Sequence, residues 1–235
     1  MYFMKKIKKN FLIIAAHPDD EILGCGGTAA KLVQEGYSGS TIIVSEGITS
    51  RDQKRNLSLR ANELKILKKK CIKANKQIGI NKVYFLDFPD NRLDTIALLD
   101  IVKKIEILIK KIKPEVVFTH NNSDLNKDHK IVYDSTITAC RPTPENKIEK
   151  ILSFEVLSST NWSSPEENNF TPNVYMDITK SIKKKLKSLN FYKTEMREYP
   201  HARSIKAVEA LSRFRGSTVG FKHAESFKLI ISRKK

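Results

Sequence analysis

The sequence predicts an α/β fold with three layers, in which helices cover both faces of a mostly parallel, Rossmann-like sheet. Short apolar runs typical of buried strands alternate with longer segments whose apolar residues recur at helical spacing. The 235 residues suffice for one such domain, and neither an internal repeat nor a long linker divides them. We therefore expect a single domain over residues 1–235.

The elements expected in the first half alternate regularly between strand and helix. Four short apolar runs with the composition of buried strands are residues 11–17, 40–45, 83–88 and 115–120. Three longer segments with helical spacing of apolar residues are 28–35, 57–74 and 95–112. The glycines of residues 24–27 predict a turn between the first strand and the first helix.

The second half extends this pattern less regularly. The expected elements are a helix over residues 128–139, a strand over 151–158, helical segments around 182–198 and 205–214, and a last strand over 226–232. This order favours helices on both sides of a sheet whose first strands are parallel.

The cysteines and apolar runs limit where the protein works. Cys25, Cys71 and Cys140 are far apart and form no C-x-x-C pair, so we expect neither disulfides nor a thiolate metal site. The apolar run of residues 11–16 is too short for a signal peptide, and no stretch approaches the ~18 apolar residues of a membrane span. We expect a cytoplasmic protein without a membrane span, and an oligomer is compatible with this composition.

The net charge of +17 raises the alternative of a nucleic-acid-binding protein. The basic residues are spread along the chain, often as solvated helix faces such as residues 68–70 and 183–185. They are not interleaved with aromatic residues, and the chain has one tryptophan. We therefore expect a small-molecule partner, which the charge allows to be phosphorylated or nucleotide-linked.

Polar side chains cluster after the first and fourth expected strands. Residues 16–21 read AHPDDE, and residues 120–129 read HNNSDLNKDH. Because open α/β sheets bind ligands at the carboxyl ends of strands, His129 can approach His17 and Asp20 if these strands are neighbours. Two imidazoles and one carboxylate leave positions open for water and substrate. This arrangement suits catalytic Zn²⁺ and would also admit iron, cobalt or manganese.

Both clusters have simpler interpretations. Aspartates after strands often cap helices, and Asp128 could be only the N-cap of the helix that follows it. Residues 24–29, GCGGTA, also fit the G-x-G-x-x-A fingerprint of dinucleotide sites. That fingerprint should begin directly after the strand, whereas residues 17–23 intervene here. We attribute the glycines to a tight turn and close packing, and we do not expect NAD.

These motifs resemble the LmbE-like (PIG-L) family of zinc-dependent N-acetylglucosamine deacetylases. The resemblance rests on AHPDDEILGCGGT at residues 16–28 and DLNKDH at residues 124–129, with weaker similarity at residues 158–162 and 223–227. It therefore covers nearly the whole chain. It implies a substrate that is an N-acetylated amino sugar, free or within a glycolipid, sugar nucleotide or thiol-glycoside precursor.

The resemblance also implies roles for individual residues. His17, Asp20 and His129 would bind zinc, and Asp19 would be the general base. Zinc would polarise the acetamide carbonyl and lower the pKa of its bound water, so that free amine and acetate result. Asp128 would orient a neighbouring imidazole or zinc ligand.

One position departs from the family pattern. Many members carry a histidine three residues before the last metal ligand, where this chain has Asn126. Asn126 can donate a hydrogen bond to an oxyanion but cannot act as an acid. His201 is our candidate for the missing imidazole, although it could equally be a surface loop residue. His223 and His120 are further candidates, and His120 is as compatible with packing at a strand end.

Substrate contacts follow less directly from the pattern. Arg60 matches a position where relatives present an arginine to substrate, although an ion pair with Glu63 would also explain it. Asp90 and Arg92 follow the third strand and could line the same cleft. Candidates for a phosphate group on the substrate are Arg141, Arg203, Arg213 and Arg215. The motifs do not separate deacetylation from metal-dependent hydrolysis of another amide or an ester.

Overall fold

The computed structural model describes residues 9–164 and 170–234, and within these ranges seven strands form one sheet. The strands are β1 (Asn10–Ala15), β2 (Ser38–Ser45), β3 (Lys82–Phe88), β4 (Val116–Thr119), β5 (Lys150–Phe154), β6 (Val174–Asp177) and β7 (Ala224–Ser232). Their order is β3-β2-β1-β4-β5-β7-β6. Strands β1 to β5 pair in parallel, whereas β7 runs antiparallel to both β5 and β6.

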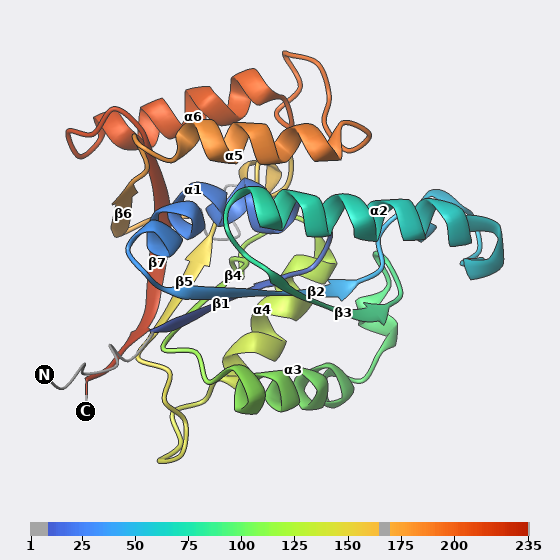
Figure 1. Cartoon of the computed structure of the whole chain (residues 1–235). Coiled ribbons are helices and arrows are strands. Elements are labelled where there is room, and N and C mark those ends of the chain that lie inside the picture. The colour runs from blue at the N-terminus through green and yellow to red at the C-terminus, as the bar shows by residue number, and fades with distance from the viewer. Residues whose placement is uncertain (1–8, 165–169, 235) are drawn as a thin grey trace, which may run out of the picture.

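Helices cover both faces of this sheet, which confirms the three-layer α/β prediction (Figure 1). The helices are α1 (Asp20–Gln34), α2 (Leu57–Gln77), α3 (Leu98–Ile112), α4 (Lys127–Ala139), α5 (Ile182–Leu189) and α6 (Ile205–Ser217). Helices α3 and α4 lie together on one face, and the other four lie on the opposite face. None of the helices in the described ranges combines the length and the apolar character needed to cross a lipid bilayer.

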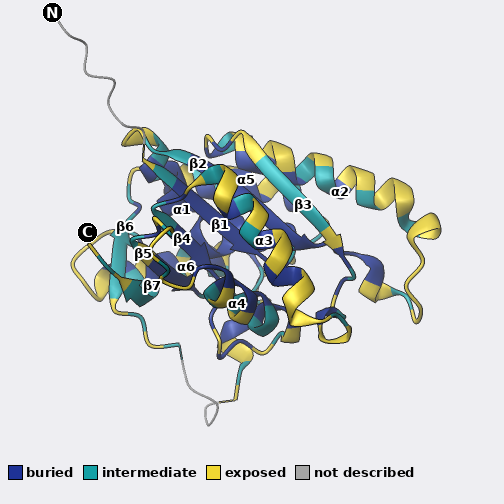
Figure 2. Ribbon diagram, turned by 90° about the horizontal axis from the view of Figure 1, so that it is seen from below, coloured by how far each residue is buried: buried dark blue, intermediate teal, exposed yellow. Residues whose placement is uncertain are grey.

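The central strand β1 contributes to both cores. Phe11, Ile13 and Ala15 pack into the core beneath α1, α2, α5 and α6, whereas Leu12 and Ile14 pack into the core that α3 and α4 cover. Successive side chains of a strand point to opposite faces, so a strand buried on both faces must be apolar throughout. Figure 2 shows this buried centre and, by contrast, the exposed outer side of α2.

The glycine-rich segment is not the expected turn. Helix α1 begins at Asp20, directly after the first motif, and runs through Gly24–Gly27 with a local break at Cys25, where φ is −146° and ψ is 21°. A Cβ atom on Gly24 would overlap the ring of Phe154, and one on Gly27 would lie 2.8 Å from the Cδ1 atom of Ile178. The glycines therefore serve close packing of the helix on the sheet, and the expected helix start at residue 28 is wrong.

The remaining differences lie mostly in the second half. Strand β6 has no counterpart among the expected strands. The expected helical segment 182–198 is helix α5 over Ile182–Leu189, followed by a 3₁₀ turn at Asn190–Tyr192. Helix α3 begins at Leu98, three residues later than expected, because the 3₁₀ turn Leu93–Thr95 precedes it.

Candidate metal centre

The two polar clusters meet because β1 and β4 are neighbouring parallel strands. His17 and Asp20 follow β1, and His129 lies in the first turn of α4, after β4. Asp20 Oδ2 lies 3.1 Å from His129 Nε2 and 3.2 Å from His17 Nδ1, and the two imidazole nitrogens are 3.3 Å apart. The three predicted ligands thus form a compact triangle of donor atoms.

This triangle fits a small divalent metal ion. Ligand atoms held ~2.1 Å from a tetrahedral zinc ion lie ~3.4 Å from one another, close to the separations found here. Asp20 is almost fully buried, and its Oδ1 atom has no hydrogen-bond partner among the described residues. A buried carboxylate oxygen without a partner is costly unless a cation satisfies it.

Carboxylates hold the outer side of His17. Its Nε2 atom lies 3.3 Å from Asp128 Oδ2 and 3.2 Å from Asp90 Oδ1. Asp128 in turn accepts backbone N–H bonds from Asn91 at 2.8 Å and Leu93 at 3.0 Å. A carboxylate on the far nitrogen orients an imidazole and strengthens it as a metal ligand, so Asp128 has the geometry predicted for it. Asp90 has the same geometry. The sequence instead suggests Asp90 as a residue of the substrate cleft.

A third carboxylate performs the same task for His129. Asp124 Oδ2 lies 3.1 Å from His129 Nδ1. The hydroxyl groups of Ser159 and Thr160 donate to Asp124, the latter at 2.6 Å, so the carboxylate is buried but fully held. Asp124 stands inside the second motif, yet the sequence did not reveal its role, because Ser159 and Thr160 come from a distant segment.

These contacts shift the pKa values of His129 and Asp124. Burial alone would lower the pKa of His129, but Asp20 and Asp124 outweigh it and raise the pKa to about 9. Burial alone would likewise raise the pKa of Asp124, but His129 lowers it to about 2. Without a metal ion, a proton on the imidazole therefore compensates the buried carboxylates, and a metal ion must displace it.

Asp19 lies beside the triangle in a different environment. Its φ of 117° is in the left-handed region, which residues with a side chain rarely adopt. Its N–H donates to Glu21 Oε2 at 2.9 Å, and Arg203 Nη1 donates to its Oδ2 atom at 3.2 Å. Burial raises the pKa of the Asp19 carboxyl above its ordinary value, and Arg203 opposes this effect. The Asp19 carboxylate is therefore oriented by a cation, whereas the predicted ligand atoms contact one another.

His120 packs against one member of the triangle, His129. Its Nε2 accepts the N–H of Ala16 at 2.8 Å, and its ring stacks on that of His129 with centroids 3.8 Å apart. The side chain is fully buried, and burial lowers its pKa well below the ordinary value. These contacts favour the packing interpretation of His120 over a role as the missing imidazole.

Asn126 and His201 lie outside the triangle. Asn126 is the N-cap of α4: its Oδ1 accepts the N–H of Asp128 at 2.8 Å, and its Nδ2 donates to Asn91 Oδ1 at 2.9 Å. His201 is exposed, and its Nδ1 accepts the N–H of Arg203 at 3.0 Å. His223 is bonded to Ser212 Oγ at 2.8 Å through Nδ1, far along the chain on the α6 side. The proton-donor role of His201 remains a prediction.

The predicted substrate arginines have protein partners. Arg60 donates to both carboxylate oxygens of Asp52, at 2.7 and 2.8 Å, and to Glu63 at 2.7 Å, as the ion-pair alternative anticipated. Arg92 donates to the carbonyl oxygen of Gln53 at 3.3 Å. A substrate contact of either residue remains a prediction, and for Arg60 it would require exchange of a carboxylate partner.

The four arginines considered for phosphate binding separate clearly. Three of them pair with glutamates: Arg141 with Glu106, Arg213 with Glu209 and Arg215 with Glu155. Arg203 instead reaches Asp19, and its Nε donates to Ser158 Oγ at 2.8 Å. Arg203 is thus the one of these four that the fold brings to the candidate metal centre.

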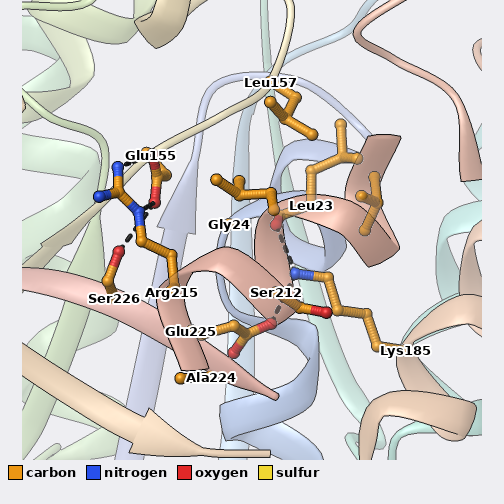
Figure 3. Close-up of a pocket in the computed structure, with 12 residues that line it drawn as sticks. Leu23, Gly24, Glu155, Leu157, Lys185, Ser212, Arg215, Ala224, Glu225 and Ser226 are labelled. Carbon is orange, nitrogen blue, oxygen red and sulfur yellow. Dashed lines mark hydrogen bonds and ion pairs between the residues drawn. The ribbon is translucent and has the colours of Figure 1, made fainter. Parts of the chain in front are cut away.

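The buried ion pair of Lys185 and Glu225 stabilises α1 at its break (Figure 3). Lys185 Nζ donates to the carbonyl oxygen of Leu23 and to Glu225 Oε1, each at 2.7 Å. Glu225 accepts the N–H groups of Gly27 at 2.8 Å and Thr28 at 2.6 Å. The cation therefore meets the free carbonyl before the break, and the anion meets the free N–H groups after it.

Comparison with known proteins groups this chain with deacetylases. A family model described as PIG-L, GlcNAc-PI de-N-acetylase, matches residues 12–140. The "Uncharacterized deacetylase YaiS" of Escherichia coli K12 is 32% identical over 178 residues, which cover 73% of this chain and 83% of that protein.

Solved structures share the fold over nearly the whole chain. N,N'-diacetylchitobiose deacetylase from Pyrococcus horikoshii matches with a TM-score of 0.76 at 21% identity, over 96% of this chain and 85% of that one. GalB, the 4-carboxy-2-hydroxymuconate hydratase from Pseudomonas putida KT2440, matches with a TM-score of 0.74 at 20% identity, over 97% and 98%. At these identities the likeness establishes the fold and leaves the reaction open.

Proposed function

Because the chain belongs to the PIG-L family, we propose that it is a zinc-dependent hydrolase that removes the acetyl group from an N-acetylated amino sugar or its conjugate. The observation that supports this most strongly is the convergence of His17, Asp20 and His129 beside the separately held Asp19. The reaction adds water across the amide C–N bond and yields a free amine and acetate. The conjugate would be a glycolipid, a sugar nucleotide or a thiol-glycoside precursor.

The ligand set suits zinc, and other divalent transition metals could replace it. When bound by His17, Asp20 and His129, zinc would supply a Lewis acid for the carbonyl oxygen and would make water more acidic. Asp90 and Asp128 would orient His17, and Asp124 would orient His129, so that both imidazoles keep their metal-facing nitrogens in position.

Asp19 is the residue we assign as general base. It would accept a proton from water as the water oxygen attacks the carbonyl carbon, and it would return a proton to the nitrogen as the C–N bond breaks. Arg203 would hold Asp19 in position throughout. Asn126 would donate its N–H to the oxyanion after releasing Asn91, and His201 is the candidate for a second proton donor.

Acetate release tests the proposal directly. The zinc-loaded protein should release acetate from at least one member of a panel: N-acetylglucosamine, N,N'-diacetylchitobiose, a nucleotide sugar and a glycolipid. The panel includes a simple acetamide and an acetate ester, because hydrolysis of another amide or ester is the main alternative. Turnover of these two without turnover of any sugar would contradict the sugar specificity.

A nucleic-acid-binding role makes a different prediction. It would require tight, salt-sensitive binding of nucleic acid by protein that contains no metal. Only the net charge of +17 supports a nucleic-acid-binding role. Such a role would leave the convergence of His17, Asp20 and His129 unexplained. Stoichiometric zinc together with acetate release would exclude it as the main function.

A further inference from the structure

The single tryptophan of the chain occupies an unusual position. Trp162 ends the 3₁₀ helix Thr160–Trp162, and 51% of its surface is exposed. An indole ring combines a large apolar surface with one N–H donor, so proteins commonly use exposed tryptophans to contact ligands.

The backbone around Trp162 is tied to both sides of the candidate metal centre. Thr160 donates to Asp124, the carboxylate on His129, at 2.6 Å. On the other side, Ser158 accepts from Arg203, the residue that donates to Asp19. Successive Cα atoms are ~3.8 Å apart, so the Cα of Trp162 lies within ~8 Å of that of Thr160. The backbone that carries the indole ring therefore lies close to the residues that hold the site.

Neighbouring groups contact this ring and close the turn that carries it. The ring of His201 meets the indole edge-to-face, with centroids 5.6 Å apart and an interplanar angle of 74°, so neither ring covers the other. His201 is itself held by the N–H of Arg203. The Oδ1 atom of Asn161 accepts the N–H of Ser158 at 2.7 Å and closes the turn that carries Trp162. These contacts restrict the turn and its ring, which lowers the conformational entropy that ligand binding would cost.

We propose that Trp162 is a stacking platform for a pyranose ring of the substrate, and that His201 positions it. One face of a pyranose carries axial C–H bonds, which form an apolar patch with slight positive charge. The negative face of an indole complements that patch, while the hydroxyl groups at the ring edge remain free for polar contacts. This assignment rests on the proposed function and narrows it, since it requires a cyclic sugar beside the acetamide and not an acetamide alone.

Exposed aromatic residues elsewhere provide a matched control. Phe214 on α6 is 62% exposed, and its ring contacts the guanidinium of Arg215, with 5.5 Å between ring centroid and Cζ. That guanidinium pairs with Glu155 rather than with a residue of the metal centre. The variant Phe214→Ala thus removes an exposed ring of similar character without touching the network around Trp162.

Intrinsic fluorescence reports on the platform directly, because all tryptophan emission of the chain comes from residue 162. The zinc-loaded Asp19→Asn variant is titrated with N-acetylglucosamine, with N,N'-diacetylchitobiose and with N-acetylethanolamine, which carries the acetamide but no ring. We expect a saturable change in emission with a sugar and none with N-acetylethanolamine.

In kinetics with the otherwise wild-type protein, Trp162→Ala should raise KM ~10-fold or more with little change in kcat. Trp162→Phe should restore most of this loss, and Phe214→Ala should behave as wild type.

The outcomes separate this inference from the proposed function. Unchanged emission at sugar concentrations that saturate acetate release, or a wild-type KM for Trp162→Ala, would overturn the platform and leave the deacetylase intact. A saturable emission change with sugar, but no acetate released by the wild-type protein from any N-acetylated sugar, would retain the platform and overturn the deacetylase.

Discussion

Two adjacent aspartates differ sharply in their surroundings. Asp20 lies within 3.6 Å of three imidazoles, whereas the carboxylate of Asp19 pairs with the guanidinium of Arg203. If Asp19 is the base, Asp19→Asn should lower kcat/KM for acetate release by ~10²- to 10⁴-fold, because an amide cannot accept the proton of water. Zinc content, measured by elemental analysis, should stay at the wild-type level. Wild-type turnover by this variant would exclude Asp19 as the base.

Asp124 should act on metal affinity. Its carboxylate fixes the far nitrogen of His129, so Asp124→Asn should weaken zinc binding by ~10- to 100-fold in competition with a chromophoric chelator. Asp134→Asn, at an exposed position of the same α4 region, is the matched control and should bind zinc normally. Equal affinities for the two variants would mean that Asp124 serves only the packing of Ser159 and Thr160.

Arg203 should affect catalysis without affecting the metal. Arg203→Gln removes the cation that holds Asp19, and small misplacements of a catalytic group can cost up to ~10²-fold in rate. We expect kcat to fall at least ~10-fold while zinc affinity is unchanged. Arg213→Gln, which breaks only an exposed pair with Glu209, should leave kcat unaltered. Loss of zinc in the Arg203 variant would instead indicate a structural role.

The sequence predicted which side chains of its two short motifs would lie together. His17, Asp20 and His129 were predictable because strand ends of neighbouring parallel strands must meet. Asp90 and Arg203 were harder to interpret, since a carboxylate or guanidinium after a strand or in a loop has many possible partners. Their roles depend on long-range contacts with His17 and Asp19 that no local pattern encodes.

Among the elements, helix α1 carries the clearest energetic test. Glu225 and Lys185 satisfy the backbone groups on either side of the break at Cys25, and both side chains are about 5% exposed. Glu225→Gln should lower the free energy of unfolding by about 3–5 kcal/mol, because it leaves the Lys185 ammonium buried without its anion. Urea denaturation measures this change through the shift in midpoint.

A double variant separates charge from packing in the same helix. Combining Glu225→Gln with Lys185→Met removes the stranded charge, so the pair should be more stable than Glu225→Gln alone. Strictly additive losses would contradict the view that the two charges compensate each other across the break.

Element boundaries also mark where sequence reasoning fell short. Glycines usually end helices, so the sequence predicts a turn at residues 24–27. The Lys185–Glu225 pair stabilises a broken helix there instead. This pair lies 160 or more residues away in the sequence, so the local pattern does not reveal it. Strand β6 is only four residues long, Val174–Asp177, and half-buried, which leaves too few positions for a recognisable period. It forms because β7 offers an edge to pair with.

For the whole molecule, the order of strands explains why the site exists. Because β4 lies beside β1, α4 and its His129 lie at the end of β1. The segment that follows β5 contains Ser159 and Thr160, whose hydroxyl groups donate to Asp124. The alternation of apolar runs predicted this class of fold, since a parallel sheet needs a crossover after each strand. The antiparallel placement of β7 between β5 and β6 was not predictable, because the direction of a strand depends on the path of the segments that connect it, which the apolar pattern of β7 does not encode.

If His17, Asp20 and His129 bind one divalent metal ion, anomalous diffraction from crystals of the zinc-loaded protein should locate that ion between them. Data collected on either side of the zinc absorption edge should give one strong difference peak ~2.0–2.2 Å from a donor atom of each of these three residues. A protein that binds zinc stoichiometrically but shows its peak at other residues, or crystals with no peak between these three side chains, would exclude them as the metal ligands.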